Sequence, residues 1–158
     1  FPYTTLFRSK ERIPIECCLV CNINTMRRDG RMRTPSASAL AARGRERHDP
    51  LAAIDHPFIQ WFAQGHPFAL CCDNVGLLQC PLSEVYQYAA EAIVAARFEP
   101  SRRAQLDFEH DAELMRQVGA CAWQLAWQAV DCSFAPDAVK ADIRQALHVH
   151  PWNPRDMH

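Results

Sequence analysis

The sequence lacks any long apolar run. No stretch approaches the roughly 18 residues that a membrane-spanning helix needs, and the N-terminus has no apolar core of a secretory signal peptide. A formal net charge of -1 gives no reason to expect a nucleic acid or an anionic membrane as partner. The composition, 49% hydrophobic and 22% charged, is typical of a globular domain. We therefore predict a soluble cytoplasmic protein.

The cysteines lack the arrangement of a secreted disulfide scaffold, which is short and spreads its cysteines through loops. Most of the eight lie in apolar runs, at positions 17, 18, 21, 71, 72, 80, 121 and 132. Buried reduced thiols are the prediction, because a free cysteine behaves as a small hydrophobic residue. One C-x-x-C motif occupies 18–21, with no second motif at zinc-ribbon spacing. A small zinc module built on Cys17, Cys18 and Cys21 is kept as an alternative.

Three segments do not resemble parts of a compact fold. Residues 2–9, PYTTLFRS, resemble a translated sequencing adaptor, so we exclude 1–10 as an artefact. Residues 26–50 hold seven arginines among Gly, Ser and Pro, which predicts an exposed loop or insert. An RNA-binding arm and a translated intron are the alternatives for that stretch. The segment 148–158 contains two prolines and is predicted to be a loose tail.

Two short apolar runs, 13–20 and 67–72, predict strands buried on both faces. Between them, a helix is expected over 57–64, ended by Gly65. Further helices are expected over 81–96, 112–131 and 136–148. Two buried strands with a helical crossover imply a parallel βαβ unit. Because two strands cannot form a closed core, we predict part of a larger α/β fold.

Several side chains have ordinary structural interpretations. His56 is expected at a helix N-terminus, and His66, which precedes a proline, in a surface turn. Glu84 falls in the first turn of a predicted helix, where a carboxylate stabilises the helix dipole or caps it. The predicted inward stripe of that helix is Tyr86, Ala89, Ala90 and Ile93. The tryptophans predicted to lie in the core are Trp61, Trp123 and Trp127.

The segment 66–90, HPFALCCDNVGLLQCPLSEVYQYAA, carries the chemistry. An apolar strand delivers Asp73 at its carboxyl end, which is the end that carries catalytic groups in barrel folds. A carboxylate there is a suitable oxygen ligand for zinc, and Gly76 lets the backbone turn close to such a site. An aspartate after a strand is also common as a turn residue or a helix cap. The residues alone leave both interpretations open.

This segment resembles the eighth strand and the following helix of the adenosine deaminase family. That family reads as an apolar strand, Thr-Asp-Asp, a Gly-containing turn, Leu-Ser-x-Glu-Tyr and Ala-Ala. The matching positions here are Cys72-Asp73-Asn74, Gly76, Leu82-Ser83-Glu84-Val85-Tyr86 and Ala89-Ala90. Further matches are the run 13–22 to the seventh strand, His56-Pro57 and Gly65-His66-Pro67 to the intervening helix, and Ala129-Val130-Asp131 with Ser133-Phe134 to a later helix end. The resemblance is closest to members that act on N6-modified AMP.

The resemblance implies the C-terminal portion of a (β/α)₈ TIM barrel, with the last two strands and the helices after them. It covers 11–147, with inserts at 26–50 and 97–118. It implies that the full-length protein is a monomer that deaminates adenosine or N6-modified AMP with one Zn²⁺ and a zinc-activated water. Asp73 would be a zinc ligand. Asn74 stands where the family has a second aspartate that binds the purine, and its amide can still donate a hydrogen bond.

The family's other site residues have no counterpart in this sequence. Its His-x-His pair, its fifth-strand histidine and its acid/base glutamate belong to strands that are missing here, so no catalytic residue is assigned. Val20 and Cys21 also replace a Thr-Ser pair. We therefore expect the isolated chain to be inactive. Two alternatives stay open, a different amidohydrolase-type zinc hydrolase and a non-catalytic remnant.

Overall fold

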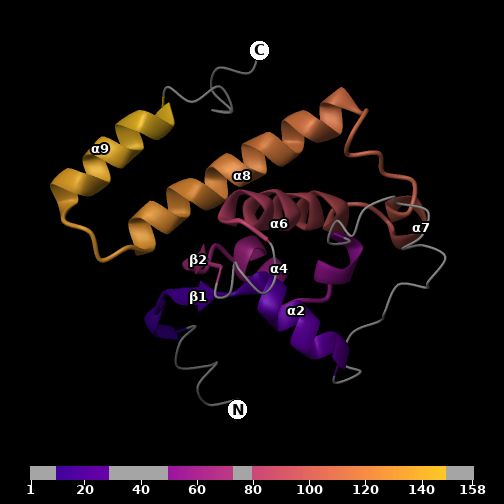
Figure 1. Cartoon of the computed structure of the whole chain (residues 1–158), viewed down its shortest axis with the longest axis horizontal. Helices are drawn as coiled ribbons and strands as arrows, with labels where there is room; N and C mark the ends of the chain where they lie inside the picture. Colours follow the sequence, from indigo (N-terminus) through magenta and orange to yellow (C-terminus); the bar gives the residue numbers. More distant parts are fainter. Residues whose placement is uncertain (1–9, 29–49, 73–79, 149–158) are drawn as a thin grey trace.

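The computed structural model describes residues 10–28, 50–72 and 80–148 (Figure 1). Its elements are β1 (Ile15–Cys17), α2 (Leu19–Arg28), the 3-10 helix η1 (Pro50–Ala53), α4 (Phe58–Ala63), β2 (Phe68–Leu70), α6 (Leu82–Ala96), α7 (Pro100–Arg103), α8 (Ala112–Cys132) and α9 (Asp137–His148). The predictions for 1–9, 29–49 and 149–158 lie outside these residues. None of the helices that the structure describes is long and apolar enough to cross a membrane.

Strands β1 and β2 pair in parallel, as predicted. Ile15 lies opposite Phe68 and Cys17 opposite Leu70, while α2, η1 and α4 come between the two strands in the sequence. The resulting βαβ arrangement is a two-stranded parallel sheet within the described residues. It is compatible with part of an α/β fold, and the barrel itself stays a prediction.

The first strand is shorter than predicted, and a helix replaces its second half. β1 ends at Cys17, and α2 begins at Leu19 and continues to Arg28, inside the predicted 26–50 loop. Leu19, Val20 and Ile23 are all buried at helical spacing. A continuous apolar run suits a buried strand and a buried helix equally, so its pattern alone could not place the boundary. The helix η1 was not predicted either.

Helix α4 begins and ends as the sequence predicts. The imidazole Nδ1 of His56 accepts a hydrogen bond from the Phe58 backbone N–H at 3.1 Å, which satisfies one of the unpaired donors of the first turn. At the other end Gly65 has a φ of 61°, the left-handed conformation that glycine adopts without steric cost. His56 is therefore a helix-capping residue.

His66 is buried, so its prediction as a surface turn residue is wrong. Its Nε2 lies 3.1 Å from the Ile13 carbonyl oxygen, and its own carbonyl accepts a hydrogen bond from Gln128 Nε2 at 2.9 Å. The backbone of Ile13, two residues before β1, and a side chain of α8 thus enclose it from two sides. Such burial depends on tertiary neighbours that the His-Pro pair does not reveal.

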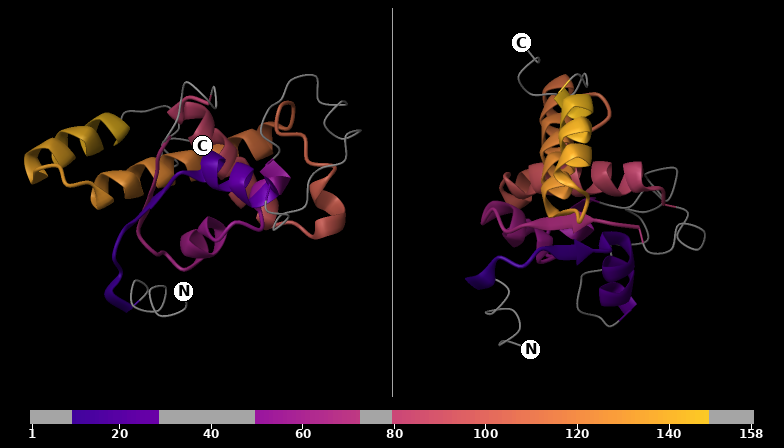
Figure 2. Two further views of the ribbon diagram at one scale, coloured as in Figure 1. Left: turned by 60° about the horizontal axis from the view of Figure 1, so that its bottom comes forward. Right: turned by 90° about the vertical axis from the view of Figure 1, so that its left-hand side faces the viewer.

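Helix α6 is the centre of the core, with α8 packed across it (Figures 1 and 2). Side chains on several sides of α6 are buried. They are Val85, Tyr88, Ala89, Ala90, Ala92, Ile93 and Val94. The predicted stripe is correct at Ala89, Ala90 and Ile93, whereas Tyr86 is half-buried. The many alanines let neighbouring elements approach closely on several sides. Leu114, Cys121 and Leu125 of α8 are buried in the same core.

The tryptophans are less deeply buried than predicted. Trp61 is half-buried and packs against the core. Trp123 and Trp127 stack with ring centroids 5.1 Å apart, and Trp123 Nε1 donates to the Leu147 carbonyl of α9 at 3.0 Å. These two rings therefore join α9 to α8. After α6, the short helix α7 buries no residue, while Phe98, Leu106 and Phe108 pack against the core.

Candidate functional site at the carboxyl ends of the strands

The parallel pairing brings the residues that follow β1 and β2 to one edge of the sheet. The Cys71 backbone N–H donates to the Cys17 carbonyl at 3.1 Å, so the pairing continues one residue beyond β2. Cys18 and Cys71 are therefore the next pair in register after Cys17 and Leu70. Their Sγ atoms lie 3.4 Å apart. This edge is where a parallel α/β sheet generally carries its ligand.

The residues on either side of 73–79 lie close together at this edge. Cys72, two residues after β2, donates from its Sγ to the Cys80 carbonyl at 2.8 Å. Asp73, Asn74 and Gly76 fall within that segment, outside the residues that the structure describes. Their roles as zinc ligand, purine contact and turn residue stay predictions.

The two faces of the sheet differ in burial. Cys17 and Phe68 are 1% exposed and Leu70 is 5% exposed on the face that packs against helices. The alternate residues point to the opposite face, where Glu16 is exposed and Ala69 is half-buried. Cys18 and Cys71 belong to this second face by alternation and are also half-buried. The candidate site therefore lies at the end of the open face.

Tyr86 of α6 borders the same region. Burial raises the pKa of its phenol, and the nearby thiols of Cys71 and Cys132 raise it further. Burial likewise raises the pKa of the Cys71 thiol well above its usual range, with the adjacent Cys18 and Glu16 adding to the effect. Near neutral pH, Tyr86 and Cys71 are both protonated, so each can donate a hydrogen bond. Tyr86 matched the family pattern, but no role was predicted for it.

The described residues do not hold a zinc ion by themselves. No group of three or more His, Cys, Asp or Glu side chains among them is placed to bind a metal. The described geometry therefore gives no support to the alternative of a small module on Cys17, Cys18 and Cys21. Cys17 points to the opposite face from Cys18 and is buried against helices. Burial also raises the pKa of the Cys17 thiol to about 12, whereas zinc binds thiolates.

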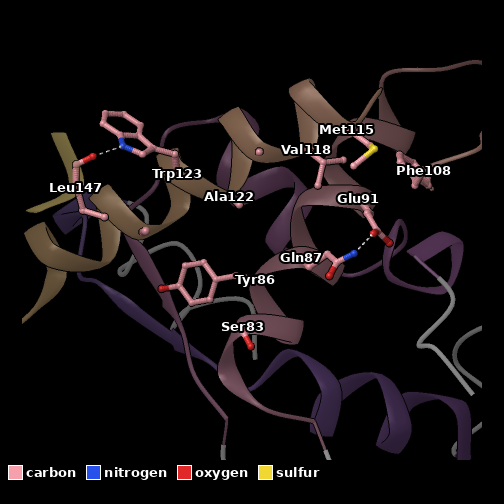
Figure 3. Close-up of a pocket in the computed structure, with 12 residues that line it drawn as sticks. Ser83, Tyr86, Gln87, Glu91, Phe108, Met115, Val118, Ala122, Trp123 and Leu147 are labelled. Atoms are coloured by element: carbon pink, nitrogen blue, oxygen red, sulfur yellow. Dashed lines mark hydrogen bonds between the residues drawn. The ribbon is translucent and has the colours of Figure 1, made fainter. Parts of the chain in front are cut away.

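A cavity lies elsewhere, between α6 and α8 (Figure 3). Its volume is about 530 Å³, and its walls are mainly apolar, including Phe108, Met115 and Trp123. On the α6 wall, Gln87 Nε2 donates to Glu91 Oε1 at 2.8 Å. Tyr86 lines the cavity and is the residue that connects it to the strand-end region.

Comparison with known proteins identifies similar chains. The human N6-methyl-AMP deaminase is 23% identical over 155 residues, which is 96% of this chain and 30% of the relative. The zebrafish (Danio rerio) protein of the same name is 28% identical over 136 residues, 86% of this chain and 26% of the relative. The predicted resemblance is confirmed. The similarity is to purine nucleotide deaminases, and this chain spans less than a third of their length.

The cattle protein (Bos taurus) agrees, with 23% identity over 147 residues. No protein-family model matches the chain, and no solved structure matches it significantly. The evidence of similarity therefore comes from relatives such as these. The alignment with the human protein covers 155 residues and includes the strand-end segment 66–90.

The structure also reveals a feature that the motif search missed, the close pair Cys18 and Cys71. A signal was present in the sequence, because each predicted strand contains two adjacent cysteines, at 17–18 and at 71–72. Only the register of the sheet shows which of these four thiols face each other.

Proposed function

We propose that this chain is part of an enzyme that hydrolytically deaminates a purine nucleoside or nucleotide, with N6-methyl-AMP as the first candidate substrate and adenosine as the second. The observation that carries the proposal is the alignment with N6-methyl-AMP deaminases over 96% of the chain in the human relative. In this reaction water replaces the amine at C6 of the purine. The products are the inosine nucleotide and methylamine from N6-methyl-AMP, or inosine and ammonia from adenosine.

The chain would contribute one part of the site. Asp73 would supply one carboxylate oxygen to zinc, and the Asn74 amide would donate a hydrogen bond to the purine ring. Zinc in such a site lowers the pKa of its bound water towards neutrality. One carboxylate cannot hold the ion, so the remaining ligands would come from elsewhere in the full-length protein. We further propose that this protein is a cytoplasmic monomer.

The open face of the sheet supports a place in a larger barrel. Parallel sheets are normally covered on both faces, yet Glu16 is exposed and Ala69 half-buried on one face of this sheet. In a barrel, that face would turn inward and meet the side chains of other strands. The buried face, with Phe68 and Leu70, already packs against the helices, as the outer face of a barrel sheet does.

A chimera tests the proposal. Residues 11–147 of this chain would replace the aligned segment of the human N6-methyl-AMP deaminase. The chimera would be incubated with zinc and N6-methyl-AMP, and the inosine nucleotide would be measured by chromatography. We expect turnover by the chimera and none by the 158-residue chain alone. Adenosine and AMP, assayed in parallel, would rank the substrates.

Three results would contradict the proposal. A folded, zinc-loaded chimera that does not turn over, even with Asn74→Asp to restore the family's second aspartate, would favour a non-catalytic remnant. Turnover by the isolated chain would show that its site is complete without further strands. Turnover by the chimera of an unrelated amide instead of a purine would favour the other amidohydrolase-type function.

A further inference from the structure

The thiols of Cys18 and Cys71 form a contact that the proposed deaminase chemistry does not use. They occupy opposite register positions at the carboxyl ends of two neighbouring parallel strands, and their Sγ atoms are 3.4 Å apart. Both side chains are half-buried, so a small reagent can reach them. Cys17, by contrast, is 1% exposed and points away from the pair.

We propose that Cys18 and Cys71 are a modification site, a dithiol that small disulfide reagents oxidise to an intrachain disulfide. A disulfide needs Cα atoms about 4.4–6.8 Å apart, and neighbouring strands lie about 4.8 Å apart. The backbone spacing at this position therefore suits the bond. The two sulfurs need to approach by a little over 1 Å to reach the bonded distance of about 2.05 Å, which a rotation about χ1 supplies.

The chemistry is thiol–disulfide exchange. One thiol of the pair loses its proton and attacks a low-molecular-weight disulfide such as oxidised glutathione. A mixed disulfide forms, and one molecule of the small thiol leaves with that proton. The second protein thiol then attacks the protein-bound sulfur and releases the second small thiol. The two protein thiols are oxidised by two electrons, and the small disulfide is reduced to two thiols.

A disulfide between Cys18 and Cys71 would constrain the fold at the carboxyl edge of the sheet. It would join the end of β1 to the end of β2 directly before segment 73–79, across 53 positions of the chain. The two strand ends could then no longer separate. The inference does not depend on the proposed function, because its readout is a covalent bond rather than turnover.

The test uses the whole 158-residue chain. Reduced protein is treated with oxidised glutathione, the remaining thiols are alkylated, and the digest is analysed by tandem mass spectrometry without reduction. We expect a cross-link between Cys18 and Cys71 in most molecules, removed by dithiothreitol. Cys18→Ser and Cys71→Ser should each lower its yield many-fold. The matched controls Cys72→Ser and Cys132→Ser, also at half-buried cysteines, should leave the yield unchanged.

Glutathione attached to Cys18 and Cys71 without a link between them would overturn the proposal. A link that joins other cysteines in preference, for example Cys21 to Cys72, would overturn it as well. The unsubstituted protein decides the question even if a serine variant fails to fold, because the position of the link is measured directly.

Discussion

The two faces of the β1–β2 sheet contrast with each other. On one face, Phe68 and Leu70 are buried among helices, and Phe58 is fully enclosed beside them. On the other, Glu16 is exposed, and Cys18 and Cys71 are half-buried. A side chain on the first face is surrounded by permanent neighbours, whereas one on the second face is open to solvent and reagents.

We therefore expect the helix-covered face to determine the stability of the fold and the open face to determine its chemical reactivity. The helix-covered face and α6 carry most of the apolar burial, so changes there should lower the free energy of unfolding. The open face and its carboxyl end carry the thiol pair and the base of segment 73–79. Changes there should alter reactivity, and turnover in the full-length protein. The predictions below test this division.

The largest loss of stability is expected from Phe68→Ala. Phe68 is 1% exposed, and its ring centroid lies 6.3 Å from that of Phe58 and 6.2 Å from that of Trp61. Removing a buried phenylalanine costs about 3–5 kcal/mol of unfolding free energy. Urea denaturation followed by circular dichroism measures it. The matched control, Phe134→Ala at a fully exposed phenylalanine, should cost less than about 0.5 kcal/mol. Equal losses would contradict the division.

Oxidation of Cys18 and Cys71 to a disulfide on the open face of the sheet should raise the free energy of unfolding. A cross-link that closes a loop of 53 positions raises the free energy of unfolding by about 4 kcal/mol if chain entropy is the main effect. The urea midpoint of the oxidised protein should rise and return on reduction. Cys18→Ser given the same oxidation should show no rise. A rise of equal size in that variant would place the link elsewhere.

His56 should make stability depend on pH. Burial lowers the pKa of its imidazole from 6.5 to about 4. The unfolded chain therefore binds the proton more readily, and the stability from the neutral buried ring is complete above about pH 6.5. It is lost as the pH falls towards about 4, by about 3 kcal/mol in all. Urea midpoints between these pH values measure this change.

The control for the pH effect is His56→Asn, which keeps a side-chain acceptor for the helix N-terminus but removes the titration. Its stability should vary less over the same pH range, whereas His110→Asn, at an exposed histidine, should keep the full dependence. If the stability of His56→Asn depends on pH as strongly as that of the unsubstituted protein, another titrating group is responsible.

The smallest loss of stability is expected from a change at the N-terminus of α8. Asp111 Oδ1 accepts hydrogen bonds from the backbone N–H groups of Glu113 at 2.9 Å and Leu114 at 3.1 Å. Asp111→Ala should cost about 1 kcal/mol, as the loss of an N-cap usually does. Thermal unfolding of this variant should be compared with that of Asp142→Ala, an exposed aspartate within α9. A larger loss for Asp142→Ala would contradict the capping role.

The sequence predicted those parts of the fold that depend on local pattern. The parallel strand pair follows from two short apolar runs. The helices α4, α6, α8 and α9 follow from apolar residues at helical spacing and from local start and stop signals. The start of α2 at Leu19 could not be predicted, because an unbroken apolar run has no period. Nor could the burial of His66, which depends on contacts with Ile13 and Gln128 far away in the chain.

The same limit applies to the site. The family motif pointed to Asp73 and to the strand that precedes it. The structure places Cys72 and Cys80, which flank 73–79, close together, and the role of Asp73 stays a prediction. The Cys18–Cys71 contact required the register of two strands 53 positions apart. No local pattern reports such a register.

The most direct test of the account is turnover of N6-methyl-AMP by the chimera with Asp73→Ala. Loss of a zinc ligand should lower kcat/KM by more than about 100-fold, the upper range for residues that only support a metal ligand. Asp55→Ala, at an exposed aspartate before α4, should leave turnover unchanged. A chimera that keeps its activity and its zinc after Asp73→Ala would contradict the assignment of this strand end to a deaminase site.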